Sequence, residues 1–425
     1  MGGVSMEWKE VRLGDIADVQ TGPFGSQLHK SDYIAEGIPC IMPTNIGPHL
    51  NFIVDGIAHV SEVDANRLSR HLTEIGDIIY ARRGDIEKCA YVTTNEEKWL
   101  CGTGCLKIRC NNEVNSRFIA YLLSTAECKK WITGNAVGTT MLNLSKGILS
   151  NLPLLVPSHE DQRRIASILS SLDRKIELNN KINADLEEMA QAIFKNWFVD
   201  FEPFKDGKFV DSELGMIPEG WKVISLNEIL DNVSGYSYKG SELQSSNIAM
   251  ATIKNFERKG GFKTEGYKEI VISKKIKETQ FVNMFDVLVA HTDLTQNAEI
   301  VGNPAIVLSK GGYEKLIMSM DLTKVISKID GVTNGLLYCI LSTSRFKEHA
   351  LGYVNGTTVL HMSKKAVPEY TCAFPKDINQ IRDLCITLDS IYKRMAVTYD
   401  ENSRLSLLRD TLLPRLMSGE LEVPE

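Results

Sequence analysis

The strongest constraint on the fold is a ladder of mostly apolar positions spaced alternately four and three residues apart. It runs from Ile165 to Trp197 and returns, shifted by 219 residues, from Leu384 to Leu416. This alternation is the seam of a coiled coil, so the sequence predicts two long helices. The seam positions are Ile165, Leu169, Leu172, Ile176, Asn179, Asn183, Leu186, Ala190, Ile193 and Trp197, then Leu384, Leu388, Ile391, Met395, Thr398, Asn402, Leu405, Arg409, Leu412 and Leu416.

The globular stretches that precede the two ladders are also similar to each other. Trp8-Lys9 at the start of the first stretch returns as Trp221-Lys222 at the start of the second. Near their ends, Gly138-Thr139-Thr140 returns as Gly356-Thr357-Thr358. The chain therefore contains an internal duplication of one unit, which predicts a protein with pseudo-twofold symmetry.

Capping signals place the ends of the predicted helices. Ser158 lies three residues before Asp161, which is the spacing of a capping box. Asp377 and Gln380 repeat this relation before the second ladder. The predicted division is a first module at 1–157, a helix at 158–202, a linker at 203–220, a second module at 221–375, a helix at 376–419 and a tail at 420–425.

Inside each module, short β-rich runs alternate with turns rich in glycine and asparagine. The runs at 77–81 and 286–290 are examples, and helical stretches follow at 116–131 and 335–352. This order of elements is typical of α+β domains. We therefore expect two pseudo-twofold-related α+β domains joined by two long antiparallel coiled-coil helices.

Three asparagines interrupt the seams in mid-helix. Asn179, Asn183 and Asn402 stand where apolar residues are expected. Polar residues at a seam fix the register and the pairing of the helices at a cost in stability. We interpret these asparagines as structural rather than catalytic.

Composition narrows the class of protein. With 425 residues and 43% hydrophobic content, the chain can bury two cores of ordinary size. No apolar run approaches the roughly 20 residues of a membrane helix, so no membrane association is expected. The nine cysteines, an odd number without a repeated spacing, favour reduced thiols and a cytoplasmic location. No metal site is predicted.

The distribution of charge matters more than its total of −6. Segments 1–157 and 215–375 are near neutral, with 15 basic against 17 acidic side chains and 18 against 16. Segments 158–214 and 376–425 are acidic, with 8 against 12 and 7 against 9. If the chain binds DNA, the DNA would approach the modules and not the acidic helices. A chain with this charge would bind DNA weakly without a basic partner.

Three short motifs, together with the repeat and the coiled coil, resemble one protein family. They are Gly22-Pro23-Phe24-Gly25-Ser26, the helix opening Gln162-x-Arg164-Ile165-Ala166-x-Ile168-Leu169-x-x-Leu172-Asp173, and Ser212-Glu213-Leu214-Gly215-Met216-Ile217-Pro218-Glu219-Gly220-Trp221. The chain resembles the DNA-specificity subunit of type I restriction-modification systems from Trp8 to Leu421. It departs mildly, since Asp161-Gln162 stands where the family commonly has Glu-Gln.

The resemblance implies a non-catalytic targeting subunit. Each module would be a target recognition domain that reads one half of a bipartite site in double-stranded DNA, and the helices would set the gap. Two adenine methyltransferase subunits, and two translocase/nuclease subunits, would join it. S-adenosylmethionine, ATP and Mg would be bound by those partners, and no cofactor by this chain. The whole complex would be an ATP-dependent site-specific deoxyribonuclease and adenine-N6 DNA methyltransferase.

The residues themselves also argue against catalysis. An adenine methyltransferase needs an Asn/Asp-Pro-Pro-aromatic tetrapeptide, and Asn303-Pro304-Ala305 does not match it. No Gly-x-x-x-x-Gly-Lys-Ser/Thr phosphate loop is present. Two alternatives stay open: a coiled-coil scaffold that binds proteins without DNA specificity, and a self-sufficient DNA modification enzyme or nuclease.

Candidate DNA contacts are donors and acceptors on loops, because arginine and lysine suit guanine whereas asparagine and glutamine suit adenine. The alternative interpretation is a solvated turn for Arg82-Arg83 and an edge strand for Tyr236 and Tyr238; we interpret His361 as packed. The candidates in the first module are Ser26, Gln27, Lys30, Thr44, Asn45, Arg82, Arg83, Thr139 and Thr140. Their counterparts are Tyr236, Tyr238, Lys239, Lys254, Asn255, His291, Thr292, Thr357 and Thr358.

The candidate loops differ between the modules. Arg82-Arg83 stands where His291-Thr292 stands, and the loops around Lys30 and Lys239 share few residues. Thr139-Thr140 and Thr357-Thr358 are the same in both, which favours phosphate positioning or a structural turn. Different loop chemistry on one scaffold predicts two unlike half-sites, hence an asymmetric target.

Overall fold

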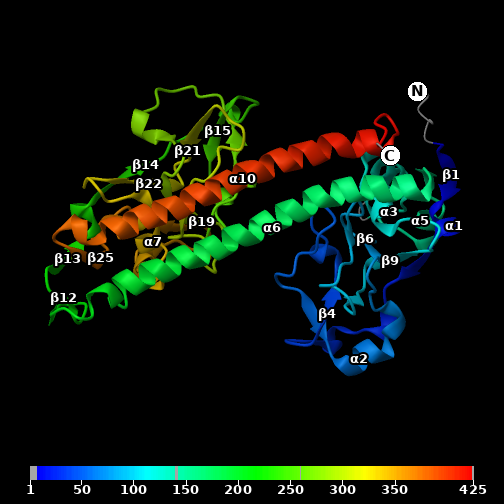
Figure 1. The fold of residues 1–425 in the computed structure, drawn as a ribbon, viewed down its shortest axis with the longest axis horizontal. Helices are drawn as coiled ribbons and strands as arrows, with labels where there is room; N and C mark the ends of the chain where they lie inside the picture. The colour runs from blue at the N-terminus through cyan, green and yellow to red at the C-terminus, as the bar shows by residue number, and fades with distance from the viewer. Residues whose placement is uncertain (1–6, 139–141, 259, 424–425) are drawn as a thin grey trace. The chain divides into compact units, whose positions relative to one another are not determined.

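The computed structural model describes residues 7–138, 142–258 and 260–423. The chain forms two compact units, one from residues 1–176 and 405–425 and the other from residues 177–404. Each unit contains one globular module and part of each of the two long helices, α6 (His159–Phe198) and α10 (Arg382–Met417) (Figure 1). We call the globular parts the first module, with elements β1 to β10, and the second module, with elements β13 to β25.

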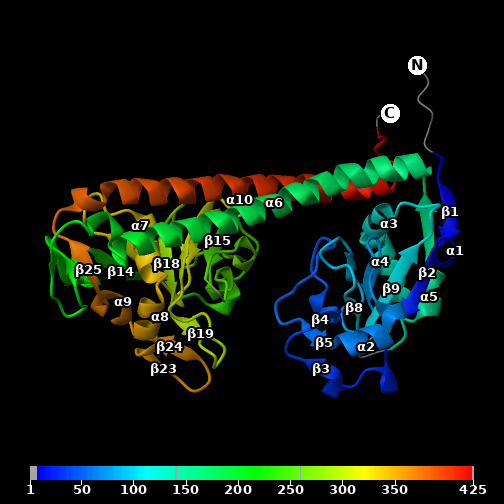
Figure 2. The ribbon, with the colours of Figure 1, turned by 60° about the horizontal axis from the view of Figure 1, so that its bottom comes forward.

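Two four-stranded sheets form the first module (Figure 2). One is antiparallel, with the order β2-β9-β6-β7. The other has the order β3-β5-β4-β8, and its β4-β8 pair is parallel. The strands are β1 (Lys9–Arg12), β2 (Ala17–Thr21), β3 (Tyr33–Ile34), β4 (Ile38–Ile41), β5 (Ala58–Val60), β6 (Ile78–Ala81), β7 (Cys89–Tyr91), β8 (Leu100–Cys101), β9 (Cys105–Cys110) and β10 (Pro153–Val156). The helices are α1 (Leu13–Ile16), α2 (Glu62–Arg67), α3 (Ser116–Leu123), α4 (Ala126–Asn135) and α5 (Lys146–Ser150).

The second module repeats the order of the antiparallel sheet and one parallel pair, and it adds a three-stranded sheet with the order β19-β24-β23. Its antiparallel sheet has the order β14-β22-β18-β20, and the order β16-β15-β21-β17 again contains one parallel pair, β15-β21. The strands are β13 (Trp221–Ser225), β14 (Leu230–Ser234), β15 (Ile248–Ala251), β16 (Lys268–Glu269), β17 (Phe281–Val282), β18 (Val287–Ala290), β19 (Thr292–Asp293), β20 (Pro304–Ile306), β21 (Lys315–Met318), β22 (Leu322–Ser327), β23 (Val354–Asn355), β24 (Leu360–Met362) and β25 (Thr371–Pro375). The helices are α7 (Asn334–Leu341), α8 (Ser344–Leu351) and α9 (Ala366–Glu369), and β11 (Phe209–Val210) pairs with β12 (Ile217–Pro218) before the module.

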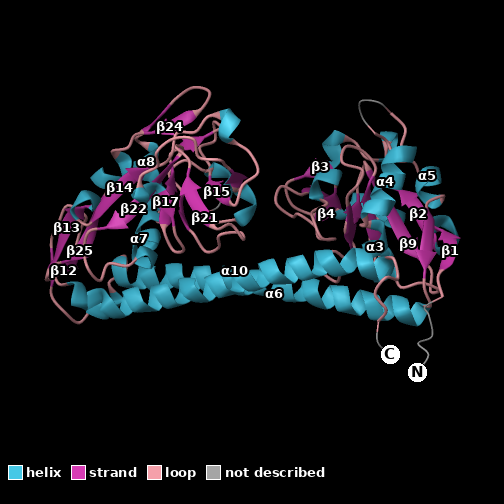
Figure 3. Cartoon of the chain, turned by 90° about the horizontal axis from the view of Figure 1, so that it is seen from above, coloured by secondary structure: helices cyan, strands magenta, loops and turns pink. Residues whose placement is uncertain are grey.

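The first and last strands of each module pair with each other, so each module is closed on itself. β1 pairs antiparallel with β10, and β13 pairs antiparallel with β25. The central strands β6 and β18 are buried along their whole length, as expected for short apolar runs between turns. Both modules therefore mix strands and helices as the sequence predicts, and the α+β fold class is confirmed (Figure 3).

One close approach of backbones recurs in both modules and explains a repeated glycine. A Cβ atom on Gly22 would lie 2.1 Å from the carbonyl oxygen of Gly102. A Cβ atom on Gly235 would lie 2.0 Å from the carbonyl oxygen of Ser319. Only glycine lets the loop after β2 or β14 pass this close to its neighbour.

The long helices begin where polar side chains satisfy the first backbone donors. The Ser158 hydroxyl accepts the backbone N–H of Asp161 at 3.2 Å just before α6, which is 40 residues long. Asp377 caps a short 3₁₀ turn, Ile378–Ile381, and α10 follows it for 36 residues. Within the described residues, no helix is long and apolar enough to span a membrane.

α6 and α10 pack antiparallel in each unit. In the unit of the first module, Asp173 of α6 pairs with Arg409 of α10, and the earlier Leu169 lies in one apolar cluster with the later Leu416. In the other unit, the Asn179 amide donates to the Asn402 amide oxygen at 2.8 Å. All the predicted seam positions are buried or half-buried. Both amide atoms of Asn183 are buried without a hydrogen-bond partner.

Candidate nucleic-acid interface

Backbone hydrogen bonds place Arg82 and His291 at the same position of their modules. The N–H of Arg82 donates to the Gly104 carbonyl at 2.8 Å, and the Arg82 carbonyl accepts from Leu144 at 2.9 Å. The N–H of His291 donates to the Asp321 carbonyl at 2.8 Å, and the His291 carbonyl accepts from Met362 at 2.8 Å. The two residues therefore stand in one structural position, directly after β6 and β18.

In the first module this position presents cationic side chains. The Arg82 guanidinium lies over the Phe24 ring, 5.8 Å from its centroid, which is within the range of a cation–π contact. Phe24 is 55% exposed, so this pair lies at the surface. Arg83 is exposed, and its backbone forms a bridge with Asn143. The first module thus offers one guanidinium group over an exposed aromatic ring and a second, exposed arginine next to it in the sequence.

In the second module the side chains at the same position are buried. His291 is 7% exposed and Thr292 is 6% exposed. Burial lowers the pKa of His291 to about 4, and Nε2 of its ring has no hydrogen-bond partner. These two side chains are too deeply buried to contact a DNA base. The exposed residues here are Leu294, Thr295, Gln296 and Asn297, which follow directly.

Asn45 and Asn255 hold matching turns together and are almost inaccessible. Asn45 is 4% exposed; its amide accepts from the Met42 N–H at 2.9 Å and donates to the Ile53 carbonyl at 3.0 Å. Asn255 is fully buried, with the corresponding bonds to Thr252 at 2.8 Å and to Lys263 at 2.8 Å. Both amides are bound to backbone groups, which favours a structural role. The neighbouring Thr44 and Lys254 are exposed.

The loops after β2 and β14 differ in how much they expose. Lys30 and Lys239 are exposed, whereas Gln27 is half-buried. Tyr236 is 3% exposed and donates its hydroxyl to Glu242 at 2.6 Å, so it packs inside the module. Tyr238 is half-buried against the same apolar cluster. The side chain of Ser26 is outside the described part of the structure.

The structure describes the second of the two repeated Gly-Thr-Thr segments in full. Thr139 and Thr140 are outside the described residues, whereas Thr357 and Thr358 are exposed. His361 on β24 is also exposed, so our interpretation of it as packed is wrong. The alternation of side chains on this short strand buries Leu360 and Met362 instead.

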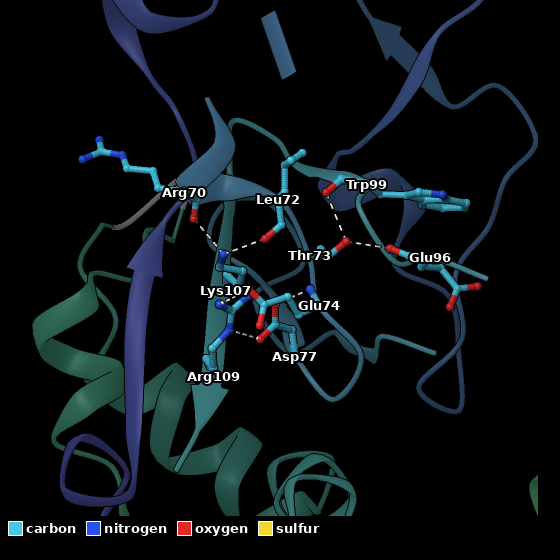
Figure 4. A network of polar contacts seen from close by, with 9 residues as sticks. All are labelled: Arg70, Leu72, Thr73, Glu74, Asp77, Glu96, Trp99, Lys107 and Arg109. Atoms are coloured by element: carbon cyan, nitrogen blue, oxygen red, sulfur yellow. Dashed lines mark hydrogen bonds and ion pairs between the residues drawn. The ribbon is translucent and has the colours of Figure 1, made fainter. Parts of the chain in front are cut away.

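Beneath these loops, one buried lysine recurs in both modules. Lys107 is 4% exposed and donates to the carbonyls of Arg70 and Leu72, both at 2.8 Å (Figure 4). Lys324 is 5% exposed and donates to the Phe281 carbonyl at 2.7 Å and to Asp286 at 3.1 Å. The Lys107 ammonium ties segment 70–72 to the central sheet of the first module, and the Lys324 ammonium ties the start of β17 to that of the second.

Figure 4 shows how the first module extends this network. Arg109 binds both carboxylate oxygens of Asp77 at 2.7 Å and reaches Glu74 at 2.6 Å. Thr73 donates its hydroxyl to the carbonyl of Glu96 at 2.6 Å. A bidentate arginine–carboxylate pair is geometrically specific, so segment 70–77 is held in one arrangement.

Sequence reasoning missed several exposed apolar residues near these positions. Val137 is 68% exposed, Leu294 is 66% exposed and Met320 is 56% exposed. An apolar residue in a loop is ordinarily assigned to the core, so the sequence carries little signal for them. Within the described ranges, no group of three or more His, Cys, Asp or Glu residues is placed to hold a metal ion.

Comparisons with known proteins agree with this architecture. The family described as type I restriction modification DNA specificity domain matches residues 6–188. The chain is 26% identical to the type I restriction enzyme MjaIX specificity subunit of Methanocaldococcus jannaschii, over 100% of this chain and 96% of that protein. It is also 26% identical to the HindI specificity subunit of Haemophilus influenzae, over 98% of this chain and 100% of that protein.

A solved structure shows the same fold. The crystal structure of a type I restriction-modification S subunit from M. genitalium aligns with a TM-score of 0.60 and 16% identity, over 97% of both chains. The similarity in sequence therefore spans both modules and both helices. The first module and the first part of α6 therefore match the type I restriction modification DNA specificity domain, and the chain as a whole is similar to specificity subunits of type I restriction enzymes.

Proposed function

We propose that each module reads one half of an asymmetric bipartite site in double-stranded DNA. One observation carries this proposal: the same backbone position presents two arginines in the first module and buries histidine and threonine in the second. A shared scaffold with unlike exposed groups is what two different half-sites require. The near-neutral modules suit DNA better than the acidic helices do.

The contacts that we retain for DNA are those with exposed side chains, together with the half-buried Arg82, whose guanidinium lies over the exposed Phe24. In the first module they are Lys30, Thr44, Arg82 and Arg83, and in the second they are Lys239, Lys254, Thr357 and Thr358. Arg82 and Arg83 have the donor geometry for guanine, and the lysines and threonines suit phosphates. Buried Asn45, Asn255, Tyr236, His291 and Thr292 support these loops from below.

The helices are proposed to bind two adenine methyltransferase subunits, and two translocase/nuclease subunits complete the complex. Exposed apolar residues on both helices support a protein-binding role, since water does not favour such a surface. They are Leu178 and Met189 on α6, and Ile386, Val397 and Leu407 on α10. In this assembly the partners bind S-adenosylmethionine, ATP and Mg, and place them near the DNA that this chain selects.

The test is to co-express this chain with the methyltransferase subunit of its own system in cells that lack other adenine methylation. Modified adenines are then mapped across the genome by single-molecule sequencing. A single bipartite motif with two unlike halves and a fixed gap is expected. A stable complex without methylation would favour the scaffold alternative, and methylation by this chain alone would overturn the non-catalytic assignment.

A further inference from the structure

The second module carries an extra loop directly after the position shared by Arg82 and His291. In the first module only residues 84–88 separate Arg83 from β7, whereas residues 294–303 separate β19 from β20 in the second. The first four residues of this longer loop, 294–297, are exposed, and Leu294 is 66% exposed. We call the whole connection, residues 294–303, the reading loop.

A buried carboxylate fixes the shape of the reading loop. Asp293 is 1% exposed and accepts the backbone N–H of Thr295 at 2.9 Å, that of Ile300 at 2.6 Å and that of Val301 at 3.3 Å. The Thr295 hydroxyl also donates to it at 2.9 Å. One carboxylate thus holds both ends of the loop.

A lysine from α8 holds the far end of the loop. The Lys347 ammonium donates to the carbonyls of Ala298 at 3.0 Å and Val301 at 2.6 Å, and to the Asn303 amide oxygen at 2.7 Å. An exposed loop that is tied to a buried carboxylate and a half-buried ammonium group loses little conformational entropy on binding. The loop is therefore preorganised to present its side chains.

The exposed groups of the loop have the chemistry of adenine–thymine recognition. Asparagine and glutamine amides bond to the N6 and N7 edge of adenine, and methyl groups contact the thymine methyl. Asn297 and Gln296 supply amides, and Thr295 supplies a methyl group. The Gln296 amide nitrogen donates to the Thr357 carbonyl at 2.7 Å, which joins the loop to the repeated Gly-Thr-Thr segment.

We propose that the reading loop of the second module recognises an A·T base pair, whereas Arg82 and Arg83 recognise guanine in the other half-site. This inference rests on the proposed function, because it names which bases the two modules read. It adds Leu294, Thr295, Gln296 and Asn297 to the specificity-determining residues. Asp293 and Lys347 are positioning residues that act through the loop.

The experiment uses the complete methyltransferase complex with the variants Asn297→Ala and Gln296→Ala, alone and combined. The expected result is relaxed specificity at one A·T pair in one half of the methylated motif. The unaltered complex should bind a duplex in which that pair is changed to G·C about 5- to 150-fold more weakly than the cognate duplex. For the double variant the two affinities should differ by less than about twofold. A 7-deazaadenine substitution at that position should weaken binding of the unaltered complex only.

Two controls make the outcome specific. Asn227→Ala removes an exposed asparagine of the same module outside the loop, and the motif should stay unchanged. Arg83→Ala should relax the specificity for a G·C pair in the other half of the motif. The inference would be overturned if the loop variants left the methylated motif unaltered, or if they relaxed the specificity at a G·C pair. In either case a bipartite motif in the unaltered complex would still support the proposed function. Thermal unfolding of each variant verifies that it is folded.

Discussion

The two modules share their buried polar framework and differ in what they expose. Lys107 and Lys324 are both buried and both donate to backbone carbonyls, and a Cβ atom added at Gly22 or Gly235 would lie 2.1 or 2.0 Å from a neighbouring carbonyl oxygen. The position after β6 presents Arg82, whereas the same position after β18 buries His291. The shared framework therefore supports the same fold in both modules, while the exposed position differs in its side-chain chemistry.

The modules also differ in how they attach to the long helices. In the first, Arg409 is 4% exposed and donates to Asp173 at 3.1 Å and to Asp410 at 2.9 Å, and its guanidinium lies 3.3 Å from Nε2 of His49. In the second, the matching seam position is Ala190, and the contact is largely apolar and aromatic. An ionic attachment is geometrically specific, whereas an apolar one is stable without directional bonds.

Removal of the ionic attachment should produce the greatest change. Arg409→Ala should lower the free energy of unfolding of the first unit by about 3–5 kcal/mol, because it leaves the half-buried Asp173 carboxylate without its cationic partner and with only the Tyr121 hydroxyl. Urea denaturation measures the change. Lys146→Ala, which removes the exposed pair with Asp18, should cost less than about 1 kcal/mol. Equal losses in both variants would contradict the ionic attachment.

A pH titration tests a property that the modules share. Burial lowers the pKa of His71 in the first module and of His291 in the second from 6.5 to about 4. The unfolded chain therefore binds these protons first, so stability is full above pH 6.5 and falls as the pH drops towards 4. The loss is on the order of 2–3 kcal/mol for each group.

The measurement is the slope of unfolding free energy against pH in that window. His291→Gln should remove about one proton from the uptake on unfolding in the second unit, and His71→Gln should do so in the first. Substitution of an exposed residue that does not titrate, Asn227→Ala, should leave the slope unchanged. A slope that stays the same in the His71 and His291 variants would count against the buried neutral histidines.

The repeated glycines test how similar the two frameworks are. Gly22→Ala and Gly235→Ala should each cost about 1–3 kcal/mol, because the added Cβ would overlap a backbone carbonyl oxygen in either module. Gly134→Ala in α4 meets no atom within 4 Å and should stabilise the protein by about 0.5–1 kcal/mol. Thermal denaturation compares the three variants, and a neutral change at Gly22 or Gly235 would refute the shared constraint.

A smaller change is expected at the seam between the helices. Asn183→Leu should raise stability by about 1 kcal/mol, because both amide atoms of Asn183 are buried without partners. Asn179→Leu should instead lower stability, because it removes bonds to Asn402 and Glu401. Opposite signs in chemical denaturation are the expected outcome. A loss in both variants would mean that Asn183 is satisfied in solution.

Much of the fold follows from the order of residues alone. The four-three ladder, the capping residues Ser158 and Asp377, and the repeated segments predict two long helices and two α+β modules, because these features depend on neighbours along the chain. The sequence also predicts that Arg82 and His291 occupy equivalent positions, because each directly follows a short apolar run that forms a strand.

Which of those candidates reach the surface depends on tertiary contacts. Burial of His291 depends on strand β24, and burial of Asn45 and Asn255 depends on turns eight residues away, whose carbonyls receive their amides. The exposure of Leu294 to Asn297 depends on Asp293 and on Lys347 from α8. Local periodicity is enough to specify the duplication and its helices, whereas accessibility is set by segments distant along the chain, which no local pattern encodes.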